Sequence, residues 1–440
     1  MMPLTNQSTQ AGSTVTEPLT LHAEYLPNIR QVSLQISAAG APDVLPEISL
    51  SESRRAVTVS LTLPESTGSV SETIKLPVKV TEGARRLLSN ATQRAGQGTG
   101  MNTGIEREFS YRLQVDDAEL VAHDAVEEHM DSFVPWAAGD MRPSTKLRCA
   151  QCKQVILDKP VDTAAISDEK SASQAGWLWK DLPSGNWAEM MDFWHCHKPD
   201  SHEGAFKQVT EDENPKVKGY GASNQVVATP GTVLVDVATF LVAAIECKGL
   251  KKATEQEINT PSSEQELLCE NCGALIGVED AIAKGWRLFK ASLAAEGRLE
   301  EGNLEAHPTE LVIAAQLLEL IERESARRFI VHCGRKDGLL IWVFNPDMRF
   351  SNSSSQHSIT SQRAMKVFFQ PTDAVEAILH PQPGKTFSLS LEELRLPLGT
   401  YASLITALEA SNSMLPPSVR SFQDTWRVGI LHRFQRLKRT

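Results

Sequence analysis

The chain carries the stretch CAQCKQVIL at residues 149–157 and the stretch CENCGALIGV at residues 269–278. In both, a C-x-x-C pair precedes an apolar run, and a tight turn between the cysteines brings two thiolates to one side of the loop. Two such turns supply the donors of a tetrahedral zinc site. We therefore predict one structural Zn²⁺ held by Cys149, Cys152, Cys269 and Cys272. Four thiolates leave no open position for a substrate, so this zinc is not expected to be catalytic.

The separation between the two pairs is unusually long for a zinc site. Cys269 lies 117 residues after Cys152, which is acceptable because the entropy of closing a loop grows only logarithmically with its length. Gly273, directly after the second pair, suits a turn that needs positive φ. Two alternatives stay open here, namely unrelated reduced thiols and a redox motif. The odd total of seven cysteines argues against a disulfide framework.

The composition, with 41% hydrophobic and 22% charged residues, is that of an ordinary globular protein. The formal net charge of −11 disfavours direct binding to nucleic acid, because the phosphates are also negative. The most apolar stretch, residues 233–245, is interrupted by Asp236 and falls far short of the ~20 residues of a membrane helix. The first residues lack the apolar run of a signal peptide. We expect a soluble, intracellular protein without membrane segments.

Hydrophobic patterning predicts an α+β fold, in which a strand-rich N-terminal part and a mixed C-terminal part are joined by a zinc-ribbon-like clasp. At 440 residues the chain is too long for one core. In the N-terminal part, residues 57–63, 73–80 and 109–115 alternate apolar with polar side chains, as half-buried strands do. We expect four consecutive regions: a disordered N-terminus (1–18), a strand-rich domain (19–139), the clasp with a Trp-rich helix and loop insertions (140–280), and a mixed α/β domain (281–440).

The C-terminal part shows both helical and strand periodicity. Apolar residues at helical spacing predict a helix over residues 308–326, and a shorter helix is expected over 401–410. The apolar runs 329–333 and 339–344 flank a glycine-containing turn and predict a hairpin, and 365–369 is a further strand. A solvated end is expected for the basic residues of the tail, Arg433, Arg436, Lys438 and Arg439.

Residues 177–197 hold half of the eight tryptophans. Ser184 can cap a short helix that ends near His197, ahead of Pro199. One face of this helix carries residues at i, i+3, i+4 and i+7, which are Trp187, Met190, Met191 and Trp194. They can anchor the helix in a core. Its end carries three metal-capable side chains, His195, Cys196 and His197, which form either a metal or partner site or an ordinary core or surface triplet.

The motif L-P-S-x-N-W at residues 182–187 leads to W-x-C-H at residues 194–197. Together with the flanking C-x-x-C pairs, these motifs resemble the HECT-like ubiquitin-conjugating-enzyme-binding proteins. The stretch LPPSVRSF at residues 415–422 is similar to the ending of that family. The resemblance covers residues 140–440 and extends more weakly into the strand-rich N-terminal part.

This resemblance implies an enzyme, a ubiquitin-protein ligase that takes ubiquitin from a conjugating enzyme and modifies substrates or itself. It also implies cyclin B as a partner. In a second, non-catalytic interpretation the protein inhibits or chaperones the metallo-β-lactamase endonuclease of pre-mRNA 3′-end processing, because a thiolate is a strong zinc ligand and displaces a catalytic water. The residues implied in partner binding are Cys196, which would enter the zinc site of the nuclease, and His195, His197, Trp194, Trp187, Leu182 and Pro183.

The name HECT sets an expectation that the sequence does not meet. A HECT ligase carries its catalytic cysteine near the C-terminus in a Thr-Cys context, whereas the last cysteine here is Cys333, in the stretch VHCG. Cys333 is the candidate for a thioester, but its place at the end of an apolar strand favours a buried structural thiol. Cys247 is open to the same two interpretations. The residues therefore do not assign a catalytic group.

Overall fold

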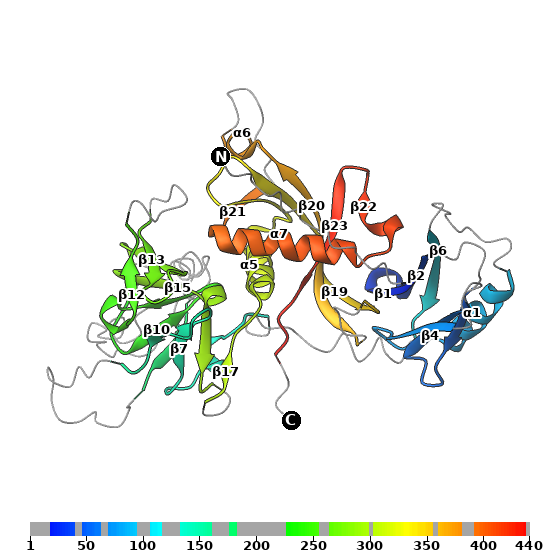
Figure 1. Ribbon diagram of the computed structural model, residues 1–440, viewed down its shortest axis with the longest axis horizontal. Helices are drawn as coiled ribbons and strands as arrows, with labels where there is room; N and C mark the ends of the chain where they lie inside the picture. Colours follow the sequence, from blue (N-terminus) through cyan, green and yellow to red (C-terminus); the bar gives the residue numbers. More distant parts are fainter. Residues whose placement is uncertain are drawn as a thin grey trace, which may run out of the picture. The chain divides into compact units, whose positions relative to one another are not determined.

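The computed structural model describes residues 18–39, 46–62, 69–94, 106–116, 133–160, 176–182, 226–254, 264–298, 302–354, 360–380 and 391–436. In this part of the chain the fold is strand-rich with few helices (Figure 1), so the α+β class is confirmed and strands dominate it. No helix among these residues is long and apolar enough to cross a membrane. The predicted disorder of residues 1–17, the Trp-rich helix over 184–197 and Lys438 and Arg439 lie outside the described residues.

The chain divides into two compact units, and each unit is assembled from three separate segments. Unit 1 consists of Met1–Glu127, Asp347–Ala364 and Ser411–Phe422. Unit 2 consists of Glu128–Pro346, Met365–Ala410 and Gln423–Thr440. Two short segments from the last hundred residues thus complete the strand-rich N-terminal part. A division of the sequence into consecutive domains does not include such returning segments.

Unit 1 contains two antiparallel sheets. Strands β1 (Leu19–Leu26), β2 (Gln31–Ala39) and β6 (Glu106–Gln114) form one sheet, and the end of β19 (Gly338–Asn352) pairs with β1, with His22 opposite Asn352. The second sheet contains β3 (Glu47–Leu50), β4 (Ala56–Thr62) and β5 (Ser69–Lys75), and α1 (Glu82–Arg94) follows it. Their inward residues share one core, which includes Leu21, Leu34, Ile36, Val57, Val59, Ile74 and Leu88.

The predicted strands of unit 1 are confirmed, with one difference in length. The pattern of residues 57–63 becomes β4, whose side chains alternate between buried and half-buried. The strand expected over residues 73–80 ends instead at Lys75. Pro77 lies just beyond that end, and because proline has no backbone N–H it cannot donate to a ladder.

The stretch at residues 415–422 is part of unit 1 and forms a compact loop with η7 (Pro417–Val419) and β22 (Ser421–Phe422). The buried carboxylate of Glu108 accepts the backbone N–H of Ser418 with both oxygens, at 3.2 and 3.3 Å. The guanidinium of Arg420 donates to the carbonyls of Leu415 and Ser413 at 2.7 and 2.8 Å. Internal polar contacts thus fix the shape of this loop.

One part of unit 2 consists of short strands around the four cysteines. A four-stranded sheet contains β7 (Lys146–Cys149), β8 (Val155–Leu157), β16 (Leu293–Glu296) and β17 (Leu304–Glu305). A seven-stranded sheet has the order β12-β13-β14-β15-β11-β10-β9. Its bounds are β9 Leu178–Asp181, β10 Thr232–Val235, β11 Thr239–Val242, β12 Leu250–Lys252, β13 Glu266–Cys269, β14 Leu275–Asp280 and β15 Gly285–Phe289. Both sheets contribute to one buried cluster, the cysteine core, which includes Trp136, Leu147, Cys149, Phe240, Leu267, Cys269 and Leu293.

The other part of unit 2 combines a sheet with two long helices. Strand β18 (Arg328–His332) pairs antiparallel with the start of β19 and parallel with β21 (Leu391–Arg395), while β20 (Gln362–Thr372) and β23 (Trp426–His432) continue the sheet beyond β19. The long helices are α5 (Thr309–Glu324) and α7 (Leu398–Ser413), and α6 (Val375–Leu379) is short. Helices and strands bury a second cluster, the helix core, which includes Phe133, Ile313, Leu317, Val331, Ile341, Val367 and Leu404.

The individual elements expected in this part are confirmed. The helix predicted over residues 308–326 is α5, and residues 401–410 lie within α7. The predicted hairpin is formed by β18 and β19, with Val331 opposite Leu339. Residues 365–369 lie within β20.

The expectation of a solvated basic tail is wrong for Arg433, which is buried, whereas Arg436 is exposed as expected. Arg433 is only 6% exposed, and it donates to the carbonyl of Pro346 at 3.2 Å while its guanidinium lies 5.9 Å from the centre of the Phe133 ring. Arg436 forms an ion pair with Asp140 at 2.9 Å. The tail is ordered because residues distant in sequence supply it with a carbonyl, an aromatic ring and a carboxylate.

Candidate metal centre

Each C-x-x-C pair sits at the turn between two antiparallel strands. Strand β7 ends at Cys149 and β8 begins at Val155, and in the same way β13 ends at Cys269 and β14 begins at Leu275. In both hairpins the pairing register shifts by an irregularity close to the first cysteine. The strand-like runs that the sequence places after each pair are confirmed, and the two turns are structural equivalents.

Matching backbone hydrogen bonds close the two turns. The N–H of Lys153 donates to the carbonyl of Cys149 at 3.0 Å, and that of Gly273 donates to the carbonyl of Cys269 at 2.8 Å. Lys153 has φ of 65° and Gly273 has φ of 72°, so both turns need a left-handed residue after the second cysteine. The prediction of positive φ at Gly273 is confirmed, and Lys153 takes the same conformation without the freedom of glycine.

The two turns face each other and bring all four sulfurs together. The Sγ atoms of Cys149 and Cys272 are 3.7 Å apart, those of Cys152 and Cys269 are 3.5 Å apart, and all four lie within 4.8 Å of one another. A tetrahedral zinc ion with Zn–S bonds of about 2.3 Å requires sulfurs separated by about 3.8 Å. The predicted donor set is thus assembled with the spacing that a tetrahedral metal ion needs, and four thiolates favour zinc among the common ions.

The environments of the four thiols differ. Burial raises the pKa of the Cys149 and Cys269 thiols, which end the two strands. The pKa of Cys152 is lowered to about 6, chiefly by a hydrogen bond from the side chain of Asn271 and then by the backbone N–H of Gln154. Because only thiolates ligate the metal, binding releases protons, and acid competes with the metal for this site.

A short segment between the two hairpins holds them side by side. The N–H of Lys248 donates to the carbonyl of Ile156 at 2.8 Å, and the carbonyl of Gly249 accepts the N–H of Glu270 at 2.9 Å. Gly249 has φ of 61°, and a Cβ atom there would lie 2.8 Å from the Gln154 amide nitrogen. Sequence reasoning missed these residues, because only the tertiary structure shows what approaches the glycine.

The two remaining described cysteines are not metal ligands. Burial, followed by the charge of Glu246, raises the pKa of the Cys247 thiol to about 12. Cys333 follows β18 and is only 3% exposed within the helix core. A thioester needs an accessible thiolate, so neither thiol is prepared for that chemistry in this conformation.

Leu182 is the one predicted partner-binding residue that the structure describes. Its N–H donates to the carbonyl of Val235 at 2.7 Å, and its side chain packs beside Leu234 and Leu241 on the seven-stranded sheet. The other predicted contact residues lie outside the described residues, and they are Pro183, Trp187, Trp194, His195, Cys196 and His197.

The family model of HECT-like ubiquitin-conjugating enzyme (E2)-binding proteins matches residues 24–428, so it includes both units and all four cysteines. The chain belongs to this family. The predicted resemblance to this family is thereby confirmed. In this HECT-like chain, the four-cysteine site lies well inside the matched region rather than in an added module.

Three proteins illustrate the similarity. An uncharacterized protein of Saccharomyces cerevisiae is 25% identical over 295 residues, which are 67% of this chain and 71% of the relative. An uncharacterized protein of Schizosaccharomyces pombe is 23% identical over 334 residues, 74% of this chain and 85% of the relative. An E3 ubiquitin-protein ligase of Bos taurus is 25% identical over 277 residues, 55% of this chain and 65% of the relative. No solved structure matches the chain.

Proposed function

We propose that this protein binds a ubiquitin-conjugating enzyme and promotes the transfer of ubiquitin to substrates or to itself. The observation that carries the proposal is the match to the E2-binding family over residues 24–428. The similarity to a bovine protein named as an E3 ubiquitin-protein ligase points the same way. Zinc held by the four cysteines would cross-link the two hairpins and stabilise the fold that receives the conjugating enzyme.

The environment of the thiols favours direct transfer over a thioester on Cys333 or Cys247. Cys333 is buried in the helix core, and the pKa of Cys247 is raised to about 12. In direct transfer, the amine of an acceptor lysine attacks the thioester carbonyl that links ubiquitin to the conjugating enzyme. An isopeptide C–N bond forms, the C–S bond breaks, the thiolate of the conjugating enzyme leaves, and the amine loses its proton to solvent.

A reconstituted assay tests the activity and its route together. Activating enzyme, a panel of conjugating enzymes and ubiquitin are incubated with wild type and with Cys247→Ala, Cys333→Ala and Cys196→Ala. We expect isopeptide products that depend on this protein and no reducible ubiquitin adduct on it. Absence of product with every conjugating enzyme contradicts the ligase function. A reducible adduct that one of the three substitutions abolishes contradicts direct transfer and identifies the thioester cysteine.

Exposed aliphatic residues of unit 2 provide variants that map the contact. Ile245 and Ile282 are 72% and 68% exposed, on the turn after β11 and on the turn between β14 and β15. Isolated exposed aliphatic groups contribute little to folding, so Ile245→Asp and Ile282→Asp should leave the fold intact. Ile29→Asp in unit 1, where the side chain is 54% exposed, is the matched control. Loss of conjugating-enzyme binding in the first two variants alone would assign the contact to this surface of unit 2.

The endonuclease and cyclin B stay predictions from resemblance, as does a location in cytoplasm and nucleus. The endonuclease interpretation depends on Cys196 and Trp194, which lie outside the described residues. It is tested by co-precipitation of the endonuclease with wild type, Cys196→Ala and Trp194→Ala. Equal recovery with all three would contradict the role of Cys196.

A further inference from the structure

Three segments of unit 2 pass between the cysteine core and the helix core at one place. Phe133 and Val134 pack in the helix core, whereas Trp136 packs in the cysteine core, so the first passage is at Pro135. The second passage runs from β17 to the start of α5. The third is the tail that follows β23. Among the described residues, the two cores are therefore connected at this place, which we call the joint.

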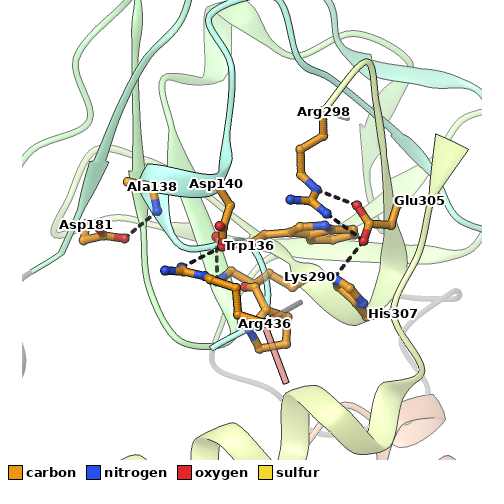
Figure 2. Close-up of polar contacts among 10 residues, drawn as sticks. Trp136, Ala138, Asp140, Asp181, Lys290, Arg298, Glu305, His307 and Arg436 are labelled. Carbon is orange, nitrogen blue, oxygen red and sulfur yellow. Dashed lines mark hydrogen bonds and ion pairs between the residues drawn. The ribbon is translucent and has the colours of Figure 1, made fainter. Parts of the chain in front are cut away.

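A buried lysine occupies this joint (Figure 2). Lys290 follows β15, and its side chain is 0% exposed. Its amine nitrogen Nζ donates to the carbonyls of Pro135 at 2.7 Å and Trp136 at 3.3 Å, and it lies 5.2 Å from the centre of the Phe240 ring. Trp136 has φ of 55°, a strained conformation for a tryptophan that the surrounding contacts must hold in place.

The second passage packs against the same tryptophan, and the third packs against the second. The centroids of the His307 and Trp136 rings are 4.7 Å apart. The Nε2 atom of His307 is 3.7 Å from a carboxylate oxygen of Glu305, and the same oxygen accepts a hydrogen bond from Arg298. In the tail, the ring of Phe434 forms a T-shaped contact with the ring of His307, and the two ring centroids are 5.2 Å apart. Figure 2 also shows the ion pair of Arg436 with Asp140, which lies four residues after Trp136.

We propose that this cluster is an acid-sensitive joint, in which protonation of Lys290 and His307 loosens the connection between the cysteine core and the helix core. The Lys290 amine and the His307 imidazole are neutral in the closed joint. Both groups accept protons more readily when the joint opens to water. The inference does not depend on the proposed ligase function, because it concerns only the connection between the two cores.

The direction of the effect follows from burial and the surrounding charges. Burial lowers the pKa of Lys290 from 10.5 to about 7, although three carboxylates facing it raise that pKa, namely Asp236, Asp181 and Asp140. Burial also lowers the pKa of His307; Glu305 and Asp140 oppose this, while Arg298 and Lys290 add to it. A base whose pKa is depressed in the closed state binds fewer protons there than in the open state. The closed joint is therefore favoured at high pH and weakens as the pH falls.

Each base acts in its own pH range. Lys290 weakens the joint as the pH falls from 10.5 toward 7, and His307 adds its effect below its ordinary pKa of 6.5. Uptake of one proton changes an opening equilibrium by up to about tenfold per pH unit. The largest change therefore lies between about pH 9.5 and 7.5.

Hydrogen exchange measured by mass spectrometry on the full chain tests the proposal. Peptides that include residues 133–141 are followed from about pH 9.5 to 5.5, with rates corrected for intrinsic exchange; the range above about pH 7.5 reports on Lys290 and the range below pH 6.5 on His307. In wild type, the opening constant should rise by about tenfold per unit as the pH falls. In Lys290→Met it should not change with pH. Lys252→Met, which removes an exposed lysine paired with Glu279, is the control and should keep the wild-type slope.

Two further variants test the proposal independently, in case Lys290→Met does not fold. Arg436→Gln removes the ion pair of the tail and should raise opening about two- to fivefold at every pH without changing the slope. His307→Phe keeps a ring against Trp136 and should remove only the increase below pH 6.5. A flat wild-type profile overturns the proposal by itself, as does a Lys290→Met protein that keeps the wild-type slope.

Discussion

The four-cysteine site and the Lys290 joint both connect segments that are far apart in the chain, but they do so by different chemistry. At the first site, four sulfurs from two hairpins lie within 4.8 Å of one another. At the second, the side-chain nitrogen of Lys290 donates to two carbonyls, and packed rings and ion pairs surround it. The first site needs a ligand from solution to be complete, whereas the second uses only groups of the protein.

This difference has consequences for how each site fails. A metal site with four thiolates is lost when the metal leaves, because the sulfurs then have no common partner. The joint contains many small contributions, so its strength changes gradually with protonation and with single side chains. The cysteine site is thus expected to act as a fixed structural element, and the joint as the adjustable one.

Removing the metal should give the largest effect. Structural zinc contributes on the order of 10 kcal/mol of binding free energy near pH 7. Chelation or Cys149→Ser should therefore unfold the β7–β8 and β13–β14 hairpins, seen as a lost thermal transition by circular dichroism alongside elemental metal analysis. Cys247→Ala, at a nearby thiol that is no ligand, should keep the full metal content. A chelated protein with an unchanged transition would contradict a structural role of the metal.

Trp136→Ala should give the next largest effect. Truncation of a buried tryptophan costs about 3–5 kcal/mol, and here it also removes the ring on which His307 packs. The free energy of unfolding, measured in urea, should fall by that amount while the metal content stays unchanged. Trp426→Ala, at a half-buried indole, should cost less. Loss of metal together with stability would show that the joint and the cysteine site are not separate.

A smaller effect should distinguish the two hairpin turns. Gly273→Ala places a side chain at φ of 72°, with no heavy atom within 4 Å of the new Cβ, so only the backbone cost of about 1 kcal/mol applies. Lys153→Gly relieves the same cost but adds flexibility to the unfolded chain, so it should change stability by less than about 0.5 kcal/mol. Denaturation of the metal-loaded proteins measures both. Equal losses in the two variants would contradict the equivalence of the turns.

Local patterns predicted many elements of the fold. The apolar spacing of residues 308–326 predicted α5, and the runs around residues 334–338 predicted the β18–β19 hairpin, because both depend on neighbours within a few residues. The pairing of β1 with the end of β19 had no such signal, although His22 lies directly opposite Asn352. Alternation shows which face of a strand is buried, but it does not show which strand will be its neighbour.

The functional residues show the same difference between features set by local sequence and features set by distant residues. Two C-x-x-C pairs predicted the donor set, since the spacing that makes a turn is written within four residues. The tail was expected to be solvated because its charges have no partner nearby in sequence, whereas Arg436 meets Asp140, 296 residues away. No pattern marked Lys290, because a single lysine after a strand is ordinarily exposed.

The sequence by itself determined the kind of metal site and its four ligands, because donor type and turn spacing are local properties. It also carried the resemblance to the family, which the match over residues 24–428 confirms. Only the tertiary structure decided that Cys333 is buried, that the tail is anchored and that Lys290 lies at a joint. Burial and electrostatic environment are produced jointly by distant segments, so they exist only once the chain has folded.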